Sequence, residues 1–187
     1  MPIDLTAPLS WKSADTDELS LLQNLQGNIL KGHGREFTAN IFFKLNPTKK
    51  VQAKRMLREL ANFHLTSAYR QLLDVEHFKA TGEGGGAFTH IALSFNGYKA
   101  LGLESSAPND PDFKAGMKAP ASISALGDPP VSSWESAFRN DIHGLVLVGE
   151  ETEGVTAALA GAIKELITDA GGTIMPSRHR PDHRSRS

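Results

Sequence analysis

"HGLVLVGEETEGVTAALAGAIKELITDAGGTIMP" (residues 143–176) is the stretch that decides the fold, because it predicts a strand, a helix and a second strand in succession. Residues 143–151 are a continuous apolar run of strand length. Apolar residues then recur at the i, i+3, i+4, i+7 spacing of a buried helix face. They are Val155, Ala158, Leu159, Ala162, Ile163, Leu166 and Ile167. We expect Thr152 to cap this helix, Gly171 to end it, and residues 172–176 to form the closing strand.

The segments before this stretch predict the same alternation of strand and helix. "FTANIFFKL" (37–45) is rich in aromatic and β-branched residues and predicts a strand. Residues 67–78 predict a helical piece. Residues 48–61 predict another helix, whose apolar stripe comprises Val51, Met56, Leu57, Leu60 and Ala61. "AFTHIALSF" (87–95) alternates as a half-buried strand does, and we expect its odd-numbered positions to face mostly inward.

A long irregular insertion, residues 104–142, separates the second and third strands. It is interrupted by prolines and predicts two short helices, at 111–119 and 132–139. Connections of this length are unusual inside a compact domain and are often functional. The order of elements predicts an α+β, ferredoxin-like βαββαβ fold, in which an antiparallel sheet carries helices on one face and the insertion lies between the middle strands.

The composition is that of one soluble globular domain. The chain has 187 residues, 40% of them hydrophobic and 22% charged, with a net charge of -1, which gives no general attraction to nucleic acid or acidic membranes. It contains no cysteine, so disulfides, thiolate ligands and a cysteine nucleophile are excluded. We see no secretory signal and no apolar run of about 20 residues, and we expect a cytoplasmic protein with no membrane partner. We expect a flexible arm over 1–19, the folded domain over 20–176, and a disordered basic tail over 177–187.

The stretch "LQGNILKGHGREF" (25–37) combines Gly27, Gly32 and Gly34 with basic side chains. A phosphate loop would need G-x-x-x-x-G-K-[ST], or G-x-G-x-x-G between a strand and a helix. Here the glycines precede a strand, so backbone amides would not gather at a helix N-terminus. We interpret the stretch as a shaped turn that leads into the first strand.

The chain's 7 histidines are the candidate metal or haem ligands, and their spacing forms no metal motif. His90 lies on a predicted strand among apolar residues, where a half-buried packing role is the commoner one. His143 opens an apolar strand, where an imidazole could in principle serve a haem. His179 and His183 stand four apart in the basic tail, where we expect only weak binding of stray metal. The others are His33, His64 and His77.

No set of residues forms a complete active site, so we assign no catalytic and no metal-binding residue. The sequence has no G-x-S-x-G nucleophile elbow. Glu150 and Glu151 stand before a predicted helix, whose dipole accounts for them without catalysis. Neither strand carries an RNA-recognition consensus, so we expect no nucleic-acid partner. The basic face of helix 48–61 is either solvated or docks on an acidic partner; it consists of Lys49, Lys50, Lys54, Arg55 and Arg58.

Several stretches taken in order resemble a known family. They are "LQGNILKGHGREF" (25–37), "TANIFFKL" (38–45), "DPDFKAGMKA" (110–119), "LGDPPVSSWE" (126–135) and "IHGLVLVG" (142–149). Over about residues 20–175 the chain is similar to the N-terminal half of dye-decolorising (DyP-type) haem peroxidases, particularly their longer bacterial and fungal branch. The resemblance implies two ferredoxin-like halves with haem b held between sheet and helices, and peroxide-dependent oxidation of dyes and other organic substrates.

One departure from the family limits what this chain is expected to do. The family's distal aspartate lies in a G-x-x-D-G motif, which this sequence lacks. The family's distal arginine and haem-ligating histidine belong to the later half. Haem peroxidase chemistry needs an axial ligand, an acid–base group and a positive charge near the peroxide. We therefore expect a truncated or separately encoded half that is inactive alone, does not bind haem b by itself, and pairs with a C-terminal peroxidase half.

Two other interpretations remain open. The chain could be a non-catalytic, ferredoxin-like interaction module that self-associates into a homo-oligomer through its sheet or an edge. It could also be a small haem-binding protein related in shape to dimeric α+β barrels, with His90 or His143 as the ligand. The sequence leaves the substrate and the oligomeric state undetermined.

Overall fold

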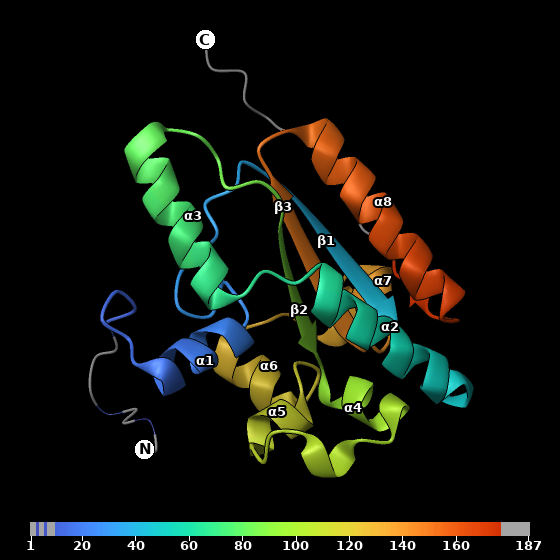
Figure 1. The fold of residues 1–187 in the computed structure, drawn as a ribbon. Coiled ribbons are helices and arrows are strands. Elements are labelled where there is room, and N and C mark those ends of the chain that lie inside the picture. The colour runs from blue at the N-terminus through green and yellow to red at the C-terminus, as the bar shows by residue number, and fades with distance from the viewer. Residues whose placement is uncertain (1–2, 4–5, 7–9, 177–187) are drawn as a thin grey trace.

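The computed structural model describes residues 3, 6 and 10–176, and its centre is a four-stranded sheet. The strands are β1 (Phe37–Lys44), β2 (Phe88–Leu93), β3 (Gly144–Glu150) and β4 (Thr173–Ile174). They lie in the order β2-β3-β1-β4, and each neighbouring pair is antiparallel (Figure 1). This order is the one that two interleaved βαβ units produce, so the predicted ferredoxin-like α+β fold is confirmed.

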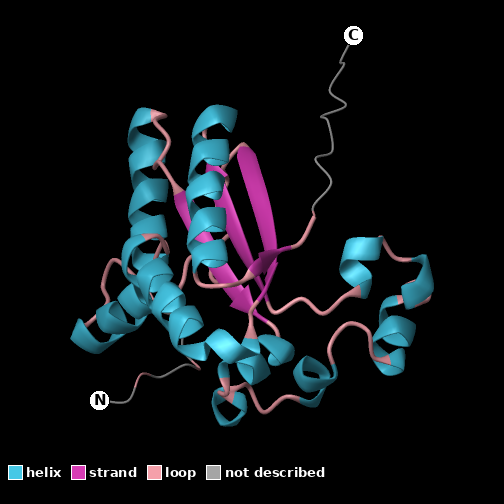
Figure 2. Cartoon of the chain, turned by 90° about the vertical axis from the view of Figure 1, so that its right-hand side faces the viewer, coloured by secondary structure: helices cyan, strands magenta, loops and turns pink. Residues whose placement is uncertain are grey.

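Two long helices, α2 (Lys50–Phe63) and α8 (Glu153–Asp169), cover one face of the sheet, and Figure 2 shows the strands side by side with helices next to them. The other long helix, α3 (Ala68–Thr81), lies on the opposite side of the strands from α2 and α8 (Figure 1). The core lies between the helical layer of α2 and α8 and the alternate residues of the strands that point toward it. Its fully buried members include Ile41, Phe43, Leu60, Val146, Val148, Ile163 and Ile167.

The strand, helix and closing strand of the deciding stretch form as predicted, but part of the predicted buried helix face is wrong. Val155, Ala158 and Ala162 are exposed. Thr156 and Ala160 are buried instead, beside Ile163 and Ile167.

Thr152 caps α8, because its hydroxyl oxygen accepts a hydrogen bond from the Val155 N–H. Gly171 follows the helix with φ of +81°, a left-handed conformation that glycine adopts without strain. The chain then returns as β4 along β1, where the Met175 N–H donates to the Phe42 carbonyl.

The buried stripe predicted for the first long helix is wrong at two residues. A 3-10 turn, η1 (Pro47–Lys49), precedes α2. The buried face of α2 consists of Ala53, Met56 and Leu60. Val51 is 72% exposed, and Ala61 is also exposed. Val51 stands two residues before Ala53, which places it on the opposite side of a helix of 3.6 residues per turn.

The second strand alternates as expected, with one exception. Thr89, Ile91 and Leu93 face the helical layer. Phe88, on the opposite face, is also fully buried, because the ring of His33 stacks on it at 5.1 Å between ring centroids.

The insertion between β2 and β3 is a chain of short helices that leaves the end of the sheet (Figure 1). It consists of α4 (Phe95–Leu101), η2 (Glu104–Ser106), α5 (Pro111–Ala115), α6 (Pro120–Leu126), η3 (Val131–Ser133) and α7 (Ser136–Arg139). The two helices predicted here are present but shorter, as α5 and α7. The predictions missed α6. This helix begins at Pro120, which is compatible with a helix start because proline is favoured in the first turn.

The N-terminal residues that the structure describes pack on α3. The ring of Trp11 meets Tyr69 edge-on at 6.2 Å, and Lys12 pairs with Glu76 at 2.8 Å. Helix α1 (Thr16–Asn24) then begins with a capping box formed by Asp15 and Glu18. The domain boundaries at 19/20 and 176/177 stay predictions, and the tail, with His179 and His183, lies outside the described residues.

Candidate functional site

The face of the sheet that points away from the helical layer is the candidate site. We call it the open face; its side chains are Thr38, Asn40 and Phe42 of β1, Leu145 and Leu147 of β3, and Phe88, His90 and Ala92 of β2. The strand registers place these residues in rows, because side chains of an antiparallel pair that lie opposite each other share a face. Phe42, Leu145 and Leu147 are only half-buried. Apolar surface is thus left partly uncovered in the centre of the sheet.

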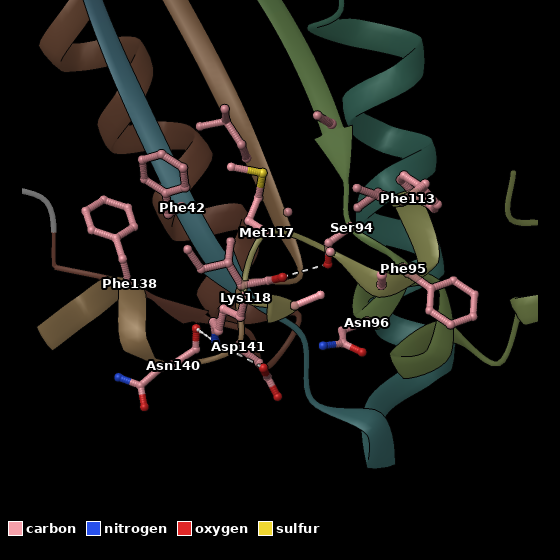
Figure 3. A pocket seen from close by; sticks show the side chains of 18 of the residues that line it. Phe42, Ser94, Phe95, Asn96, Phe113, Met117, Lys118, Phe138, Asn140 and Asp141 are labelled. Atoms are coloured by element: carbon pink, nitrogen blue, oxygen red, sulfur yellow. Dashed lines mark hydrogen bonds and ion pairs between the residues drawn. The ribbon is translucent and has the colours of Figure 1, made fainter. Parts of the chain in front are cut away.

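A cleft of about 1060 Å³ lies between the insertion and the end of the open face at which β1 and β2 end and β3 begins. Phe42, Ala92 and Leu145 line it from the sheet, and Met117 and Phe138 line it from the insertion (Figure 3). The rings of Phe42 and Phe138 meet edge-on at 5.2 Å between centroids. The cleft is therefore apolar and aromatic, as ligand and partner sites commonly are.

Polar contacts hold the two walls of the cleft together. The ammonium group of Lys118 donates to the carbonyl oxygens of Arg139 at 3.0 Å and Asn140 at 2.6 Å, and it lies 3.3 Å from a carboxylate oxygen of Asp141. The Ser94 hydroxyl donates to the Ile142 carbonyl at 2.6 Å. These bonds tie residues far apart in the insertion to the start of β3, so the cleft is a built feature of the fold (Figure 3).

The glycine-rich stretch crosses the upper part of the open face beside β2. We call residues 26–35 the strap. The Gln26 side chain accepts from the Ile91 N–H at 2.9 Å and donates to the Ile91 carbonyl at 3.2 Å, so it occupies the edge of β2 as a further strand would. Gly27 approaches Phe88 so closely that an added Cβ would lie 2.7 Å from the ring. The stretch is thus a structural lead into β1, as predicted, but it also covers part of the sheet.

A buried charge cluster anchors the end of the strap. Arg35, with 10% of its side chain exposed, lies 3.5 Å from Asp74 and 3.6 Å from Glu151. Its Nε also donates to the Gly86 carbonyl at 2.7 Å. Asp74 is 6% exposed and receives a second cation, Arg70, at 2.9 Å. The cluster joins the strap, α3 and the end of β3 at one point.

Sequence reasoning missed the residues of α3 that hold the strap. Gln71 and Asp74 are buried, and they follow the buried Ala68 at steps of three residues. Polar side chains at helix positions that face inward normally have a specific partner, and that signal could have identified them. Glu151, interpreted from the sequence as a helix-dipole residue, pairs with Arg35 instead.

The two histidines considered as haem ligands have opposite ring chemistry. In His143, Nδ1 accepts a hydrogen bond from the Leu45 N–H at 3.0 Å, so a neutral ring carries its proton on Nε2. Burial, assisted by the charge of Lys44 and opposed by Asp141, lowers the pKa of His143 and favours this neutral form. In His90, Nδ1 lies 3.1 Å from the Gly27 carbonyl oxygen and donates to it, so the neutral tautomer of this ring has its lone pair on Nε2.

The other described histidines occupy separate places. The His33 Nδ1 accepts the Arg35 N–H at 2.9 Å, and burial followed by the charge of Arg35 lowers its pKa. His64 follows the end of α2, and His77 lies 3.5 Å from Glu83 on the surface of α3. Within the described part of the chain, no three histidine or acidic side chains gather as a metal site.

The described residues do not fit a complete haem site. Among the described residues no histidine lines the apolar cleft, and His90 lies outside its lining. His143 would have to give up its bond to Leu45 N or lose a further proton to ligate iron. The open face and the cleft instead leave apolar side chains partly exposed, among them Phe42, Leu145 and Leu147.

The basic face of α2 lies on the helical layer, away from this site. Its five cationic residues are all exposed: Lys49, Lys50, Lys54, Arg55 and Arg58. Among the residues that the structure describes, no helix combines the length and the apolar character needed to cross a membrane.

These features define a ferredoxin-like α+β domain with one helical layer and one open sheet face. Residues 24–179 match the family model described as "DyP dimeric alpha+beta barrel domain". The "Multifunctional dye peroxidase DyP2" of Amycolatopsis sp. (strain ATCC 39116 / 75iv2) is 35% identical over 166 residues, which cover 89% of this chain and 34% of that protein. The chain belongs to the DyP-type peroxidase family.

Solved structures agree with this assignment. The structure of DyP2 from Amycolatopsis sp. ATCC 39116 superposes with a TM-score of 0.79 at 32% identity, covering 92% of this chain and 36% of that one. The DyP-type peroxidase AnaPX of Anabaena sp. superposes with a TM-score of 0.76 at 32% identity, covering 82% of this chain and 33% of that one. The chain spans about a third of the length of these relatives.

Proposed function

We propose that this chain is the N-terminal domain of a DyP-type haem peroxidase and that a segment outside these 187 residues completes the enzyme on the open face. Family membership, together with coverage of about a third of the relatives' length, carries the proposal. The half-covered apolar residues Phe42, Leu145 and Leu147 support it, because burying such surface is what drives folded segments to associate.

The chain is proposed to be inactive by itself. The sequence lacks the G-x-x-D-G motif, and the described histidines do not form a haem site. Splitting the O–O bond of a peroxide requires groups that hold iron, move a proton and stabilise the leaving oxygen. Loss of one stabilising donor in an enzyme costs about 10²–10³-fold in rate, and here several would be supplied from elsewhere.

The completed enzyme is proposed to bind haem b and to oxidise dyes and other organic substrates with peroxide, as the family resemblance implies. Co-expression with the part of Amycolatopsis DyP2 that follows the matched region tests this. A Soret band and dye oxidation in the purified complex, both absent from either part alone, are expected. A complex that forms without haem, or the absence of any complex, would reject the proposal.

Self-association is the second candidate function. The family model is described as a dimeric barrel domain, and a second copy could cover the same apolar residues of the open face. Light scattering of the purified chain distinguishes the two: a dimer stable at micromolar concentration, unaffected by the DyP2 fragment, would favour a self-associating module. We further propose a cytoplasmic location, which fractionation of the source cells would test.

A further inference from the structure

The strap presents two apolar side chains to solvent at its tip. Ile29 and Leu30 are adjacent and are each 55% exposed. Lys31 follows them and is exposed as well, and no ion pair of its ammonium group occurs among the described residues. A tip of this kind combines an apolar anchor with one positive charge, which suits an apolar pocket with a carboxylate at its rim.

The tip is held rigidly by a buried side chain. Gln71 is 4% exposed; its carbonyl oxygen accepts the Asn28 N–H at 2.9 Å, and its amide nitrogen donates to the Lys31 carbonyl at 2.9 Å. One side chain therefore fixes the backbone on both sides of Ile29 and Leu30. Asn28 has φ of +67°, the only positive value at a non-glycine position among the described residues. Such a conformation costs free energy and persists because the surroundings impose it.

The tip is continuous with the open face. Before it, the Gly27 carbonyl accepts from His90 on β2, and after it His33 stacks on Phe88 of the same strand. The strap thus stands beside the surface that a completing segment would cover. Other apolar residues are as strongly exposed, and they lie on other elements: Val51 and Phe63 on α2, Phe78 on α3, and Met117 and Leu126 in the insertion. Met117 lines the cleft, so it is a second exposed apolar group beside the open face.

We propose that the strap is a preorganised docking element, in which Gln71 holds Ile29 and Leu30 outward to enter an apolar, acid-rimmed pocket on the segment that completes the peroxidase. This inference rests on the proposed function and assigns a part of its interface. Preorganisation raises affinity because the ordering of the loop occurs before binding. Burial of the two apolar side chains on binding adds to affinity because apolar surface is removed from water.

Affinity of the 187-residue chain for the DyP2 fragment that follows the matched region tests the proposal. The double variant Ile29→Ser, Leu30→Ser should bind about 10- to 100-fold more weakly, because two half-exposed apolar groups no longer become buried. Gln71→Met should weaken binding about 10-fold and speed hydrogen exchange in residues 28–31. The matched control Val51→Ser makes a similar change on α2 and should leave affinity unchanged.

Each outcome has a separate meaning. Strap variants that keep their circular dichroism and bind as tightly as wild type would overturn the docking role while leaving the proposed function intact. Failure of the unmodified chain to bind, when the matched region of DyP2 does bind, would overturn the proposed function and this inference with it. If the chain alone forms a dimer that the double variant disrupts, the strap's partner is a second copy and the assignment to the completing segment is wrong.

Discussion

Replacing Arg35 by methionine is the perturbation whose effect on stability the structure defines best. Arg35 is nearly buried and lies close to Asp74 and Glu151, with its Nε bonded to the Gly86 carbonyl. Methionine retains much of the apolar stem but removes the charge and the donors. Asp74, at 6% exposure, would then keep only Arg70, whose own side chain is 66% exposed.

The expected cost follows from these contacts. Removing one partner of a buried ion pair typically costs about 3–5 kcal/mol, because the other charge is left uncompensated. Arg70 remains beside Asp74 and reduces this penalty, so we expect a loss of about 2–4 kcal/mol. With a urea dependence of about 2 kcal/mol per molar, the unfolding midpoint should fall by about 1–2 M.

Equilibrium urea unfolding followed by circular dichroism measures this shift. Arg70→Met is the matched control, and it should cost less than about 1 kcal/mol because Arg70 is largely solvated. Adding Asp74→Asn to Arg35→Met should recover part of the loss, because the buried charge is removed. A midpoint for Arg35→Met equal to that of wild type, or an equal cost for Arg70→Met, would refute the view that this cluster anchors the strap.

Three further predictions concern the core, the cleft and the pH dependence. Gly97→Ala should lower stability by more than about 2 kcal/mol in thermal unfolding, because its Cβ would collide with the His143 backbone carbonyl; a near-neutral effect would contradict the packing of α4 on β3. Phe138→Ser should reduce the fluorescence of a bound apolar dye without changing the circular dichroism, since it removes one wall of the cleft; unchanged fluorescence would mean that the dye binds elsewhere. Burial, and to a smaller extent the positive charge of Lys44, lowers the pKa of His143 from its usual value of about 6.5. As the pH falls below about 6.5, the unfolded chain therefore takes up the proton before the folded chain does, and the free energy of unfolding should decrease. His143→Asn keeps an acceptor for the Leu45 N–H and should make urea midpoints less dependent on pH between about 5.5 and 7.5; an unchanged dependence would exclude His143 as its source.

Periodicity in the sequence predicted the elements of the sheet and its helical layer. The runs that became β1, β3 and α8 carry strong, regular apolar patterns, and local pattern decides such elements. The error at Val51 arose because an apolar residue in a helix was assigned to the buried face without first fixing the centre of that face. Phe88 could not be placed as fully buried, because its cover is the strap, a segment distant in sequence.

The candidate site was harder to predict from the sequence, because it too depends on contacts between segments that are distant in sequence. The cleft exists because the insertion returns to the sheet and Lys118 bonds to the residues around Asp141. Hydrogen bonds between residues so far apart in sequence leave no periodic signal. The ring chemistry of His90 and His143 likewise depends on which backbone group each nitrogen meets, Gly27 in one case and Leu45 in the other.

The identity of the chain as one part of a peroxidase is tested most directly by haem titration of the purified 187-residue protein, followed by a peroxide-consumption assay. We expect no stoichiometric Soret band and no turnover above free haem, and the appearance of both when the DyP2 fragment that follows the matched region is added. Stoichiometric haem binding and sustained peroxide turnover by the chain alone would contradict the account.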